Sequence, residues 1–384
     1  MIIDPAARTR DVREYYFSRK NRQIAELNAR RDTPVINLGI GSPDRRPPQE
    51  AIDTLCDMAQ QDGVHAYQSY LGAPQLREAF ARWYERYYDV KLDPSCEIQP
   101  LTGSKEGILL LSLAFLDKGD KVLVPDPGYP TYTSASRLCE AQILSYDLRE
   151  EDGWMPDFDA LEAMDLSGVK MMWTNYPNMP TGAPASRDLY ERLVRFGLEH
   201  NILICNDNPY SFILNDKPLS ILSVPRAREC CVELNSLSKA HNMSGWRVGM
   251  IAGEREYVSE LLKVKSQMDS GMFRPLQFAA AAALDRGPEW FEKLNGEYRL
   301  RKQAAARIFD YLGVKYNPDS QGLFLWGKRG ADAEAVSDRL LEEAGVFITP
   351  GFIFGKNGSE YLRISLCAEP EVFEEALERI RKVI

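Results

Sequence analysis

The stretch that decides the fold is Glu233-Leu-Asn-Ser-Leu-Ser-Lys-Ala-His-Asn-Met-Ser-Gly-Trp-Arg-Val-Gly249. It begins as the end of an apolar run and then breaks into small polar residues around one lysine. Lys239 lies between Ser238 and Ala240, directly after an expected strand, which is not the usual setting of a solvated lysine. Burial beside a cation lowers the pKa of a lysine and makes its amine nucleophilic. Arg247 can supply that cation and also bind a phosphate. An isolated Ser-Lys pair would more often be a surface lysine in a loop.

The bulk composition limits the classes of protein that this chain can belong to. It has 384 residues, enough for two or more domains, and a net charge of −9, whereas a nucleic-acid-binding surface would be basic. No apolar run reaches the roughly 20 residues of a membrane span, and the N-terminus lacks the features of a signal peptide. The seven cysteines are dispersed, and the three histidines show no metal-ligand spacing. We therefore expect a cytoplasmic protein without a metal, nucleic-acid or membrane partner.

Short apolar runs alternate with helical patterns through most of the chain. Such alternation is typical of a parallel sheet covered by helices. The runs expected as strands are 98–102, 121–124, 141–145, 169–173, 201–205, 231–234 and 248–252. A long charged helix is expected from about 288 to 312, and a shorter α/β alternation follows it. The pattern predicts an α/β fold with more than one domain.

A carboxylate follows the apolar run that precedes the lysine strand. Asp207 comes directly after residues 201–205, and Tyr210 comes three residues later. Open α/β sheets bind ligands at the carboxyl ends of their strands. An Asp-Asn-Pro sequence is also ordinary turn chemistry. Its place one strand before Lys239 favours a functional role.

Two glycine-containing turns are candidate anion sites. Gly39 and Gly41 leave backbone N–H groups uncovered for a ligand carboxylate, although a plain turn explains them equally well. Residues Gly103-Ser-Lys105 join a strand to a helix N-terminus, where free N–H groups and the helix dipole attract anions. The spacing is not that of a Walker loop, and strand-turn-helix joints of this kind are common.

Two further side chains stand out by their surroundings. Tyr129 lies among three prolines and a glycine at a strand end, where its ring could stack on a heteroaromatic cofactor or pack in the core. Arg363 lies in a strand between Leu362 and Ile364. An arginine among apolar neighbours usually has a carboxylate partner, which could belong to the chain or to a ligand.

The pattern Ser-x-Ser-Lys-x-x-x-Met-x-Gly-x-Arg-x-Gly at 236–249 resembles the Schiff-base segment of the class I and II aminotransferases, the fold-type I pyridoxal-phosphate enzymes. The resemblance runs in the family's order from Gly41 to Arg363. Its residue pattern is most similar to that of the branch of the LL-diaminopimelate, alanine and aspartate aminotransferases. One position departs: Met179 stands where the family's asparagine donates to the cofactor's 3-oxygen. Either Asn178 takes over this role, or the hydrogen bond is missing.

The resemblance implies a set of site residues around bound pyridoxal phosphate. Lys239 would hold the cofactor as a Schiff base and move the Cα proton, and Asp207 would pair with the ring nitrogen. The implied catalytic residues are Lys239, Asp207 and Tyr210; the cofactor contacts are Ser104, Lys105, Tyr129, Asn178, Asp207, Tyr210, Ser236, Ser238, Lys239, Arg247 and Tyr67; the substrate contacts are Gly41 and Arg363. The implied reaction moves an amino group from an L-amino acid to a 2-oxo acid in ping-pong order.

The resemblance also implies an architecture and a partner. It implies a large cofactor-binding domain at 48–284, with a mostly parallel central sheet flanked by helices. Residues 285–384 would form a smaller α/β domain, which the N-terminal segment 1–47 would join. The active sites would lie at the interface of a homodimer, where Tyr67 would reach the phosphate of the neighbouring subunit.

Other functions fit parts of the pattern. A pyridoxal-phosphate-dependent C–S lyase or decarboxylase on the same fold would use the same anchor residues. The need for a 2-oxo acid acceptor distinguishes it from an aminotransferase. A nucleotide-binding protein would use Gly103-Ser-Lys105 and would not be yellow. A binding module on an inactive fold would be expected to lack the lysine or the aspartate, and both are present.

Overall fold

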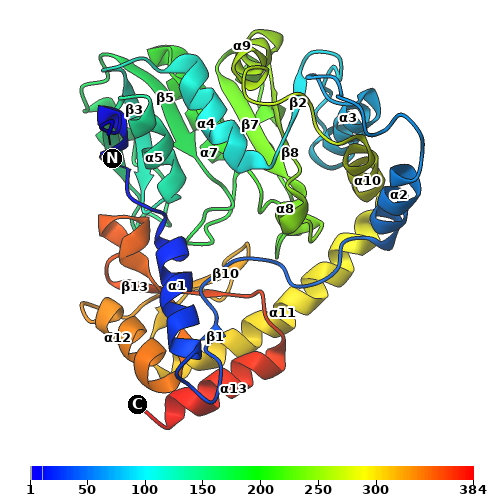
Figure 1. Ribbon diagram of the computed structural model, residues 1–384. Helices are drawn as coiled ribbons and strands as arrows, with labels where there is room; N and C mark the ends of the chain where they lie inside the picture. The colour runs from blue at the N-terminus through cyan, green and yellow to red at the C-terminus, as the bar shows by residue number, and fades with distance from the viewer. Residues whose placement is uncertain (1, 11) are drawn as a thin grey trace.

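The computed structural model describes residues 2–10 and 12–384, and its centre is a seven-stranded sheet (Figure 1). The strand order is β2-β8-β7-β6-β5-β3-β4. The strands are β2 (Ile98–Leu101), β3 (Lys121–Asp126), β4 (Gln142–Asp147), β5 (Val169–Thr174), β6 (Leu203–Asp207), β7 (Cys231–Ser236) and β8 (Gly249–Gly253). Strands β3 to β7 are parallel to their neighbours among themselves, and β8 is antiparallel to both β7 and β2. The predicted mostly parallel sheet is confirmed.

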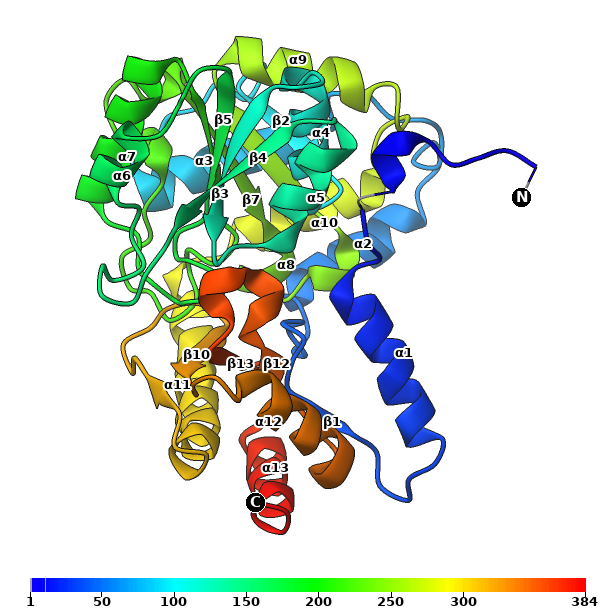
Figure 2. The same cartoon turned by 90° about the vertical axis from the view of Figure 1, so that its left-hand side faces the viewer.

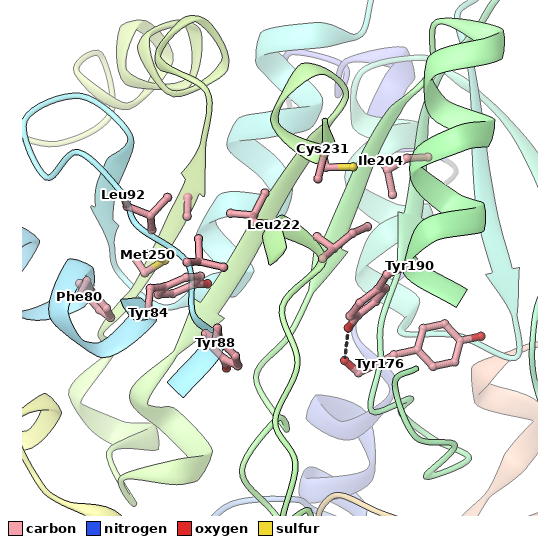
Figure 3. Close-up of a cluster of buried hydrophobic side chains, with 14 of the residues drawn as sticks. Phe80, Tyr84, Tyr88, Leu92, Tyr176, Tyr190, Ile204, Leu222, Cys231 and Met250 are labelled. Carbon is pink, nitrogen blue, oxygen red and sulfur yellow. Dashed lines mark hydrogen bonds between the residues drawn. The ribbon is translucent and has the colours of Figure 1, made fainter. Parts of the chain in front are cut away.

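Helices cover both faces of this sheet, which explains why its central strands are continuous apolar runs. Every residue of β6, β7 and β8 is buried, as expected for strands that are covered on both faces. The helices are α2 (Gln49–Ala59), α3 (Pro74–Tyr88), α4 (Ser104–Phe115), α5 (Pro130–Leu138), α6 (Phe158–Glu162), α7 (Arg187–His200), α8 (Leu237–Ala240), α9 (Arg255–Lys265) and α10 (Arg274–Leu284). Figure 3 shows the core on one face, where Phe80, Tyr84 and Tyr88 of α3 pack near Met250 of β8.

A second, smaller layer lies at the lower end of the large sheet (Figure 2). It contains a four-stranded antiparallel sheet in the order β12-β13-β10-β9 and a parallel pair, β1 with β11. Its elements are α1 (Tyr16–Asn28), β1 (Ile36–Asn37), α11 (Pro288–Tyr311), β9 (Lys315–Tyr316), β10 (Phe324–Lys328), α12 (Ala333–Arg339), β11 (Val346–Phe347), β12 (Thr349–Pro350), β13 (Tyr361–Ser365) and α13 (Pro370–Arg381). Short 3-10 turns are η1 (Ala7–Thr9), η2 (Ile221–Ser223), η3 (Ala227–Glu229), η4 (Ser244–Trp246), η6 (Gly351–Phe354) and η7 (Lys356–Gly358), and η5 (Leu340–Ala344) is a π-helical turn.

Both ends of the chain contribute to this smaller layer. Ile36 of β1 lies opposite Val346 of β11, and the N–H of Leu38 donates to the backbone oxygen of Phe347 at 2.9 Å. The long helix α11 runs from the smaller layer up to α2 and α10 (Figure 1). These pairings agree with a small domain made of both chain ends, although the boundaries at 47 and 284 stay a prediction. Within the described residues, no helix is both long and apolar enough to cross a membrane.

Local sequence explains where the elements that carry the candidate residues begin and end. Pro130 starts α5, because proline suits the first turn of a helix, and Tyr129 is the residue directly before this helix. Strand β6 continues two residues beyond the expected run, which makes Asp207 its last residue. Ser236 caps α8 through a hydrogen bond from the N–H of Ser238 at 3.1 Å. Lys239 therefore lies in a short helix at the carboxyl end of β7.

Candidate active site

A cavity of about 250 Å³ lies where the large sheet meets the smaller layer, at the carboxyl ends of β6 and β7. This is the edge of a parallel sheet at which α/β proteins bind ligands. Eleven of the thirteen candidate residues line it: Gly41, Ser104, Lys105, Tyr129, Asp207, Tyr210, Ser236, Ser238, Lys239, Arg247 and Arg363. The structure therefore brings together residues that are spread over more than 300 positions of the chain.

The amine of Lys239 is held inside this cavity. It donates a hydrogen bond to the backbone oxygen of Gly41, on the opposite wall. Burial lowers the pKa of Lys239 to about 8, and the positive charges of Arg363 and Arg247 act in the same direction. A larger fraction of this amine than of an exposed lysine is uncharged near neutral pH, so it is more readily available as a nucleophile and as a base.

Asp207 is buried with one oxygen left without a partner. Its Oδ2 accepts a hydrogen bond from the hydroxyl of Tyr132 at 2.9 Å, whereas Oδ1 has no partner among the described residues. Burial raises the pKa of the Asp207 carboxyl to about 7, against the lowering effect of the Tyr132 hydrogen bond. Buried polar atoms normally have a hydrogen-bond partner, so the free Oδ1 indicates a ligand cation or N–H group.

Small polar groups and one guanidinium surround the turn before α4. The hydroxyl of Ser236 donates to Ser238 Oγ at 2.8 Å, and Arg247 donates to the same hydroxyl at 3.4 Å. Gly103 has a φ of 81°, and a Cβ there would lie 2.1 Å from a nitrogen of Arg247. Only glycine allows this approach, which places Arg247 beside the N-terminus of α4. Backbone N–H groups, hydroxyls and a guanidinium around one point form a site for a phosphate.

Arg363 forms the opposite wall and has no carboxylate partner among the described residues. One of its terminal nitrogens donates to the backbone oxygen of Gly39 at 2.6 Å. Its guanidinium carbon lies 3.8 Å from the ring centroid of Phe324 and 4.6 Å from that of Phe354. Burial lowers the pKa of Arg363 to about 10. The internal salt bridge considered from the sequence is therefore not formed, and the guanidinium is available to a ligand carboxylate.

Two candidate residues do not line the cavity. The Asn178 side chain is used inside its own turn, where Oδ1 accepts from the Thr181 hydroxyl at 2.7 Å and Nδ2 donates to the Asn175 backbone oxygen at 3.1 Å. Asn178 was expected beside the cofactor, and instead Asn175 and Met179 line the cavity. The physical reason is that hydrogen bonds within the turn hold the Asn178 side chain away from the cavity, whereas Met179 lines it. Tyr67 is 90% exposed and also lies outside the cavity of its own chain.

Five aromatic residues of the cavity were not identified from the sequence: Tyr15, Phe17, Tyr132, Phe324 and Phe354. Tyr15 and Phe17 come from the start of α1 and line the cavity, and the Lys105 amine lies 4.3 Å from the Tyr15 ring centroid. Tyr132 stacks on Trp173 with ring centroids 5.0 Å apart. Tyr132 could have been identified, because it comes three residues after Tyr129 and residues three apart lie on the same side of a helical turn. Tyr15 and Phe17 had no such signal, because an amphipathic helix explains them fully.

Comparison with known proteins identifies the family. Residues 33–380 match the model of the aminotransferase class I and II family. An LL-diaminopimelate aminotransferase from Aquifex aeolicus (strain VF5) is 39% identical over 373 residues, 96% of each chain. One from Desulforudis audaxviator (strain MP104C) is 40% identical over 385 residues, 99% of this chain and 98% of the relative. The structure of apo-BacF from Bacillus subtilis superposes with a TM-score of 0.96 at 34% identity, covering 100% of this chain and 98% of that one.

This chain therefore belongs to the class I and II aminotransferases and has their fold-type I architecture. It is a pyridoxal-phosphate-dependent aminotransferase, which moves an amino group between an amino acid and a 2-oxo acid. The residues present fit this cofactor. The unpartnered Oδ1 of Asp207 suits a protonated ring nitrogen, the amine of Lys239 suits an aldehyde, and the turn at Gly103 suits a phosphate.

Proposed function

We propose that Lys239 and Asp207 are the catalytic pair of this aminotransferase. Bound pyridoxal phosphate supplies a ring that takes up the electron pair released at the substrate Cα. Asp207 would keep the ring nitrogen protonated through Oδ1, and Tyr132 orients that carboxylate. The Lys239 amine would attach the cofactor and then carry the proton from the substrate Cα to the cofactor's C4′ atom. The observation that supports this most is that one cavity contains both the lysine of lowered pKa and the unpartnered carboxylate oxygen.

The remaining cavity residues receive binding roles in this proposal. Ser104, Ser236, Ser238 and Arg247 would hold the phosphate, with Lys105 beside them, and Tyr129 would lie against the ring. Tyr210 would donate to the ring 3-oxygen, whereas the Asn178 amide already donates to the Asn175 backbone oxygen. Arg363 and the Gly41 loop would hold the α-carboxylate of the substrate. A carboxylate fits Arg363 because its guanidinium is buried beside aromatic rings without an internal counter-ion.

We propose LL-diaminopimelate as the amino donor or product, because relatives that bear this name are 35–40% identical over nearly the whole chain. The test is a half-reaction assay in which the protein loaded with pyridoxal phosphate is mixed with single amino acids. We expect a spectral change with LL-diaminopimelate at lower concentration than with L-aspartate or L-alanine. A spectral change only with the other amino acids would rule out LL-diaminopimelate as the substrate. Ammonia or carbon dioxide released without a 2-oxo acid would instead indicate a lyase or decarboxylase.

We also propose that the enzyme is a homodimer and that Tyr67 completes the site of the partner. Large exposed apolar side chains gather on two neighbouring loops: Tyr67, Tyr70, Leu71, Met268 and Phe273. The loops touch, because His65 stacks on Phe273 with ring centroids 5.9 Å apart. Exposed apolar groups that lie together are typical of a protein interface. Light scattering should give twice the chain mass, and Phe273→Asp should shift it toward the single chain. A wild-type monomer at micromolar concentration would contradict the proposal.

The domain division and the location of the protein remain proposals of the same kind. We propose 48–284 as the cofactor-binding domain and 285–384 with 1–47 as the smaller domain, which the pairing of β1 with β11 supports. A cytoplasmic location is supported by the seven cysteines, all of which are free thiols. Limited proteolysis near residues 47 and 284 would test the division.

A further inference from the structure

A buried lysine lies behind the phosphate turn and takes no part in the reaction described above. Lys265 is the last residue of α9 and is 1% exposed. Its amine lies 3.1 Å from Glu106 Oε1 and also contacts the carboxylate of Asp269. A buried charge is costly unless it is paired and hydrogen-bonded, and two carboxylates around one amine meet that condition. This group therefore holds three segments of the chain at one point.

The first of these segments is the phosphate turn itself. Glu106 lies in the first turn of α4, two residues after Ser104. Its second oxygen, Oε2, accepts the backbone N–H of Thr102 at 2.5 Å. The backbone oxygen of Thr102 in turn accepts from Arg247 at 3.4 Å. Because Lys265 fixes the Glu106 carboxylate, it also fixes the turn from Thr102 to Ser104 against Arg247.

The second segment is the loop after α9, which continues into the exposed apolar surface. Asp269 Oδ1 accepts the backbone N–H of Gly271 at 3.1 Å. Gly271 has a φ of 88°, and a Cβ there would lie 2.6 Å from the backbone oxygen of Gln68. The residue before Gln68 is Tyr67. The loop that Asp269 shapes therefore supports the segment that carries Tyr67.

We propose that Lys265 is a positioning residue for the cofactor. It acts through Glu106 on the phosphate turn of its own chain and through Asp269 on the loop that supports Tyr67. This inference rests on the proposed roles of Ser104 and Arg247 in holding the phosphate. When the amine is removed, the largely buried Glu106 carboxylate loses its cation and is repelled by the partly exposed Asp269 carboxylate, and the Glu106 side chain turns away from Thr102. The N–H groups at the start of α4 then lose their fixed direction, and the phosphate is held less tightly.

The test compares Lys265→Met with a control variant that removes the cationic partner of a buried carboxylate elsewhere in the chain. Arg228→Met is that control, because Arg228 donates to the largely buried Glu97 at 2.6 Å, at the opposite end of β2 from Thr102. The measurements are the melting temperature of the cofactor-free protein and the dissociation constant for pyridoxal phosphate, read from protein fluorescence. We expect both variants to melt at lower temperature, but only Lys265→Met to bind pyridoxal phosphate about tenfold or more weakly, by analogy with residues that orient metal ligands.

Conservative variants keep the test decisive. Lys265→Arg retains the cation and should bind pyridoxal phosphate within about threefold of the wild type. If Lys265→Met does not fold, the double variant Lys265→Met/Asp269→Asn is measured in its place. It removes one of the two carboxylates that lose their cationic partner. Equal affinities of wild type, Lys265→Met and Arg228→Met would overturn the inference, and so would an equal loss in both variants. A wild-type protein that binds no pyridoxal phosphate would overturn the proposed function together with this inference, whereas unchanged binding by the variant overturns this inference alone.

Discussion

The two walls of the active-site cavity differ in the charge that each leaves unpaired. The wall formed by the large sheet presents the carboxylate of Asp207 with a free oxygen, next to a lysine whose pKa burial has lowered. The wall formed by the smaller layer presents the guanidinium of Arg363, held among aromatic rings without a carboxylate among the described residues. Each wall can therefore pair with a different ligand group. The Asp207 carboxylate can pair with a cationic ring, and the Arg363 guanidinium can pair with a carboxylate.

Because of this difference, cofactor binding and substrate binding depend on different elements of the chain. The cofactor wall is built on fully buried strand ends, β6 and β7, whose position the whole sheet determines. The substrate wall is built on β13 and on the Gly39–Gly41 loop, which belong to a layer that meets the sheet only at its edge. Substitutions on the first wall should alter affinity for pyridoxal phosphate or its chemistry, and substitutions on the second should alter only affinity for amino acids.

The largest expected effect is that of Lys239→Ala on the first wall. Without the amine, the proton at the substrate Cα has no carrier, so kcat should fall by about 10⁴-fold. The visible absorption of the loaded protein should also change, because the cofactor is then bound only through its phosphate and ring contacts. Steady-state turnover and an absorption spectrum measure both effects. A variant with near-normal turnover would show that another group moves the proton.

Asp207→Asn should change how stability depends on pH. In the cofactor-free protein the Asp207 pKa is about 7, above that of an unfolded aspartate, so the folded state binds an extra proton between about pH 4 and 7. The stability that this proton supplies is present below pH 4 and is lost as the pH rises to 7. Asparagine does not titrate, so the free energy of unfolding of the variant, relative to the wild type, should rise by about 4 kcal/mol across that window. Denaturant unfolding at a series of pH values measures this difference. If the free energies of unfolding of wild type and variant changed in parallel with pH, Asp207 would not have the raised pKa.

Arg363→Met tests the second wall. It removes the cation for the substrate carboxylate, so kcat/KM for amino acids should fall by about 100-fold or more, which corresponds to about 3 kcal/mol. The dissociation constant for pyridoxal phosphate should stay unchanged, because the cofactor lies against the other wall. Phe324→Leu serves as a control for lost aromatic packing around the guanidinium. If Arg363→Met weakened cofactor and substrate binding equally, the separation of the two walls would not hold.

The smallest expected effect is that of Tyr132→Phe. The substitution removes one hydrogen bond to Asp207 Oδ2 and keeps the stacking on Trp173. A single buried hydrogen bond contributes about 1 kcal/mol, so kcat should fall about five- to tenfold. The pKa of Asp207 should rise further, because the hydroxyl hydrogen bond lowers it in the wild type. An unchanged pH profile together with unchanged kcat would show that Tyr132 only packs.

The sequence predicted the cofactor wall better than the substrate wall. Asp207 is the last residue of one continuous apolar strand and Lys239 comes shortly after another, and the two strands are parallel neighbours, so both residues lie at the same edge of the sheet. The strand β6 was expected to end at Cys205, and it continues to Asp207 because pairing with Leu234 of β7 extends it. Boundaries of this kind depend on the neighbouring strand, which local sequence does not contain.

The substrate wall depends on contacts between distant segments. Tyr15 and Phe17 reach the cavity only because α1 lies beside the smaller layer, and their spacing is that of any amphipathic helix. The cofactor wall also contains one position that local sequence did not determine: Asn178 was expected at the cofactor, but hydrogen bonds to Thr181 and Asn175 within the turn set the direction of its side chain. A residue type at a family position does not determine which of two adjacent side chains points into the cavity.

The measurement that tests the central assignment most directly is reduction of the loaded protein with borohydride, followed by peptide mass mapping. Borohydride fixes pyridoxal phosphate covalently to the amine that carries it. Our assignment predicts one modified peptide, with the pyridoxyl group on Lys239, and no adduct in Lys239→Ala. An adduct on another lysine such as Lys105, or no adduct in the wild-type protein, would contradict it.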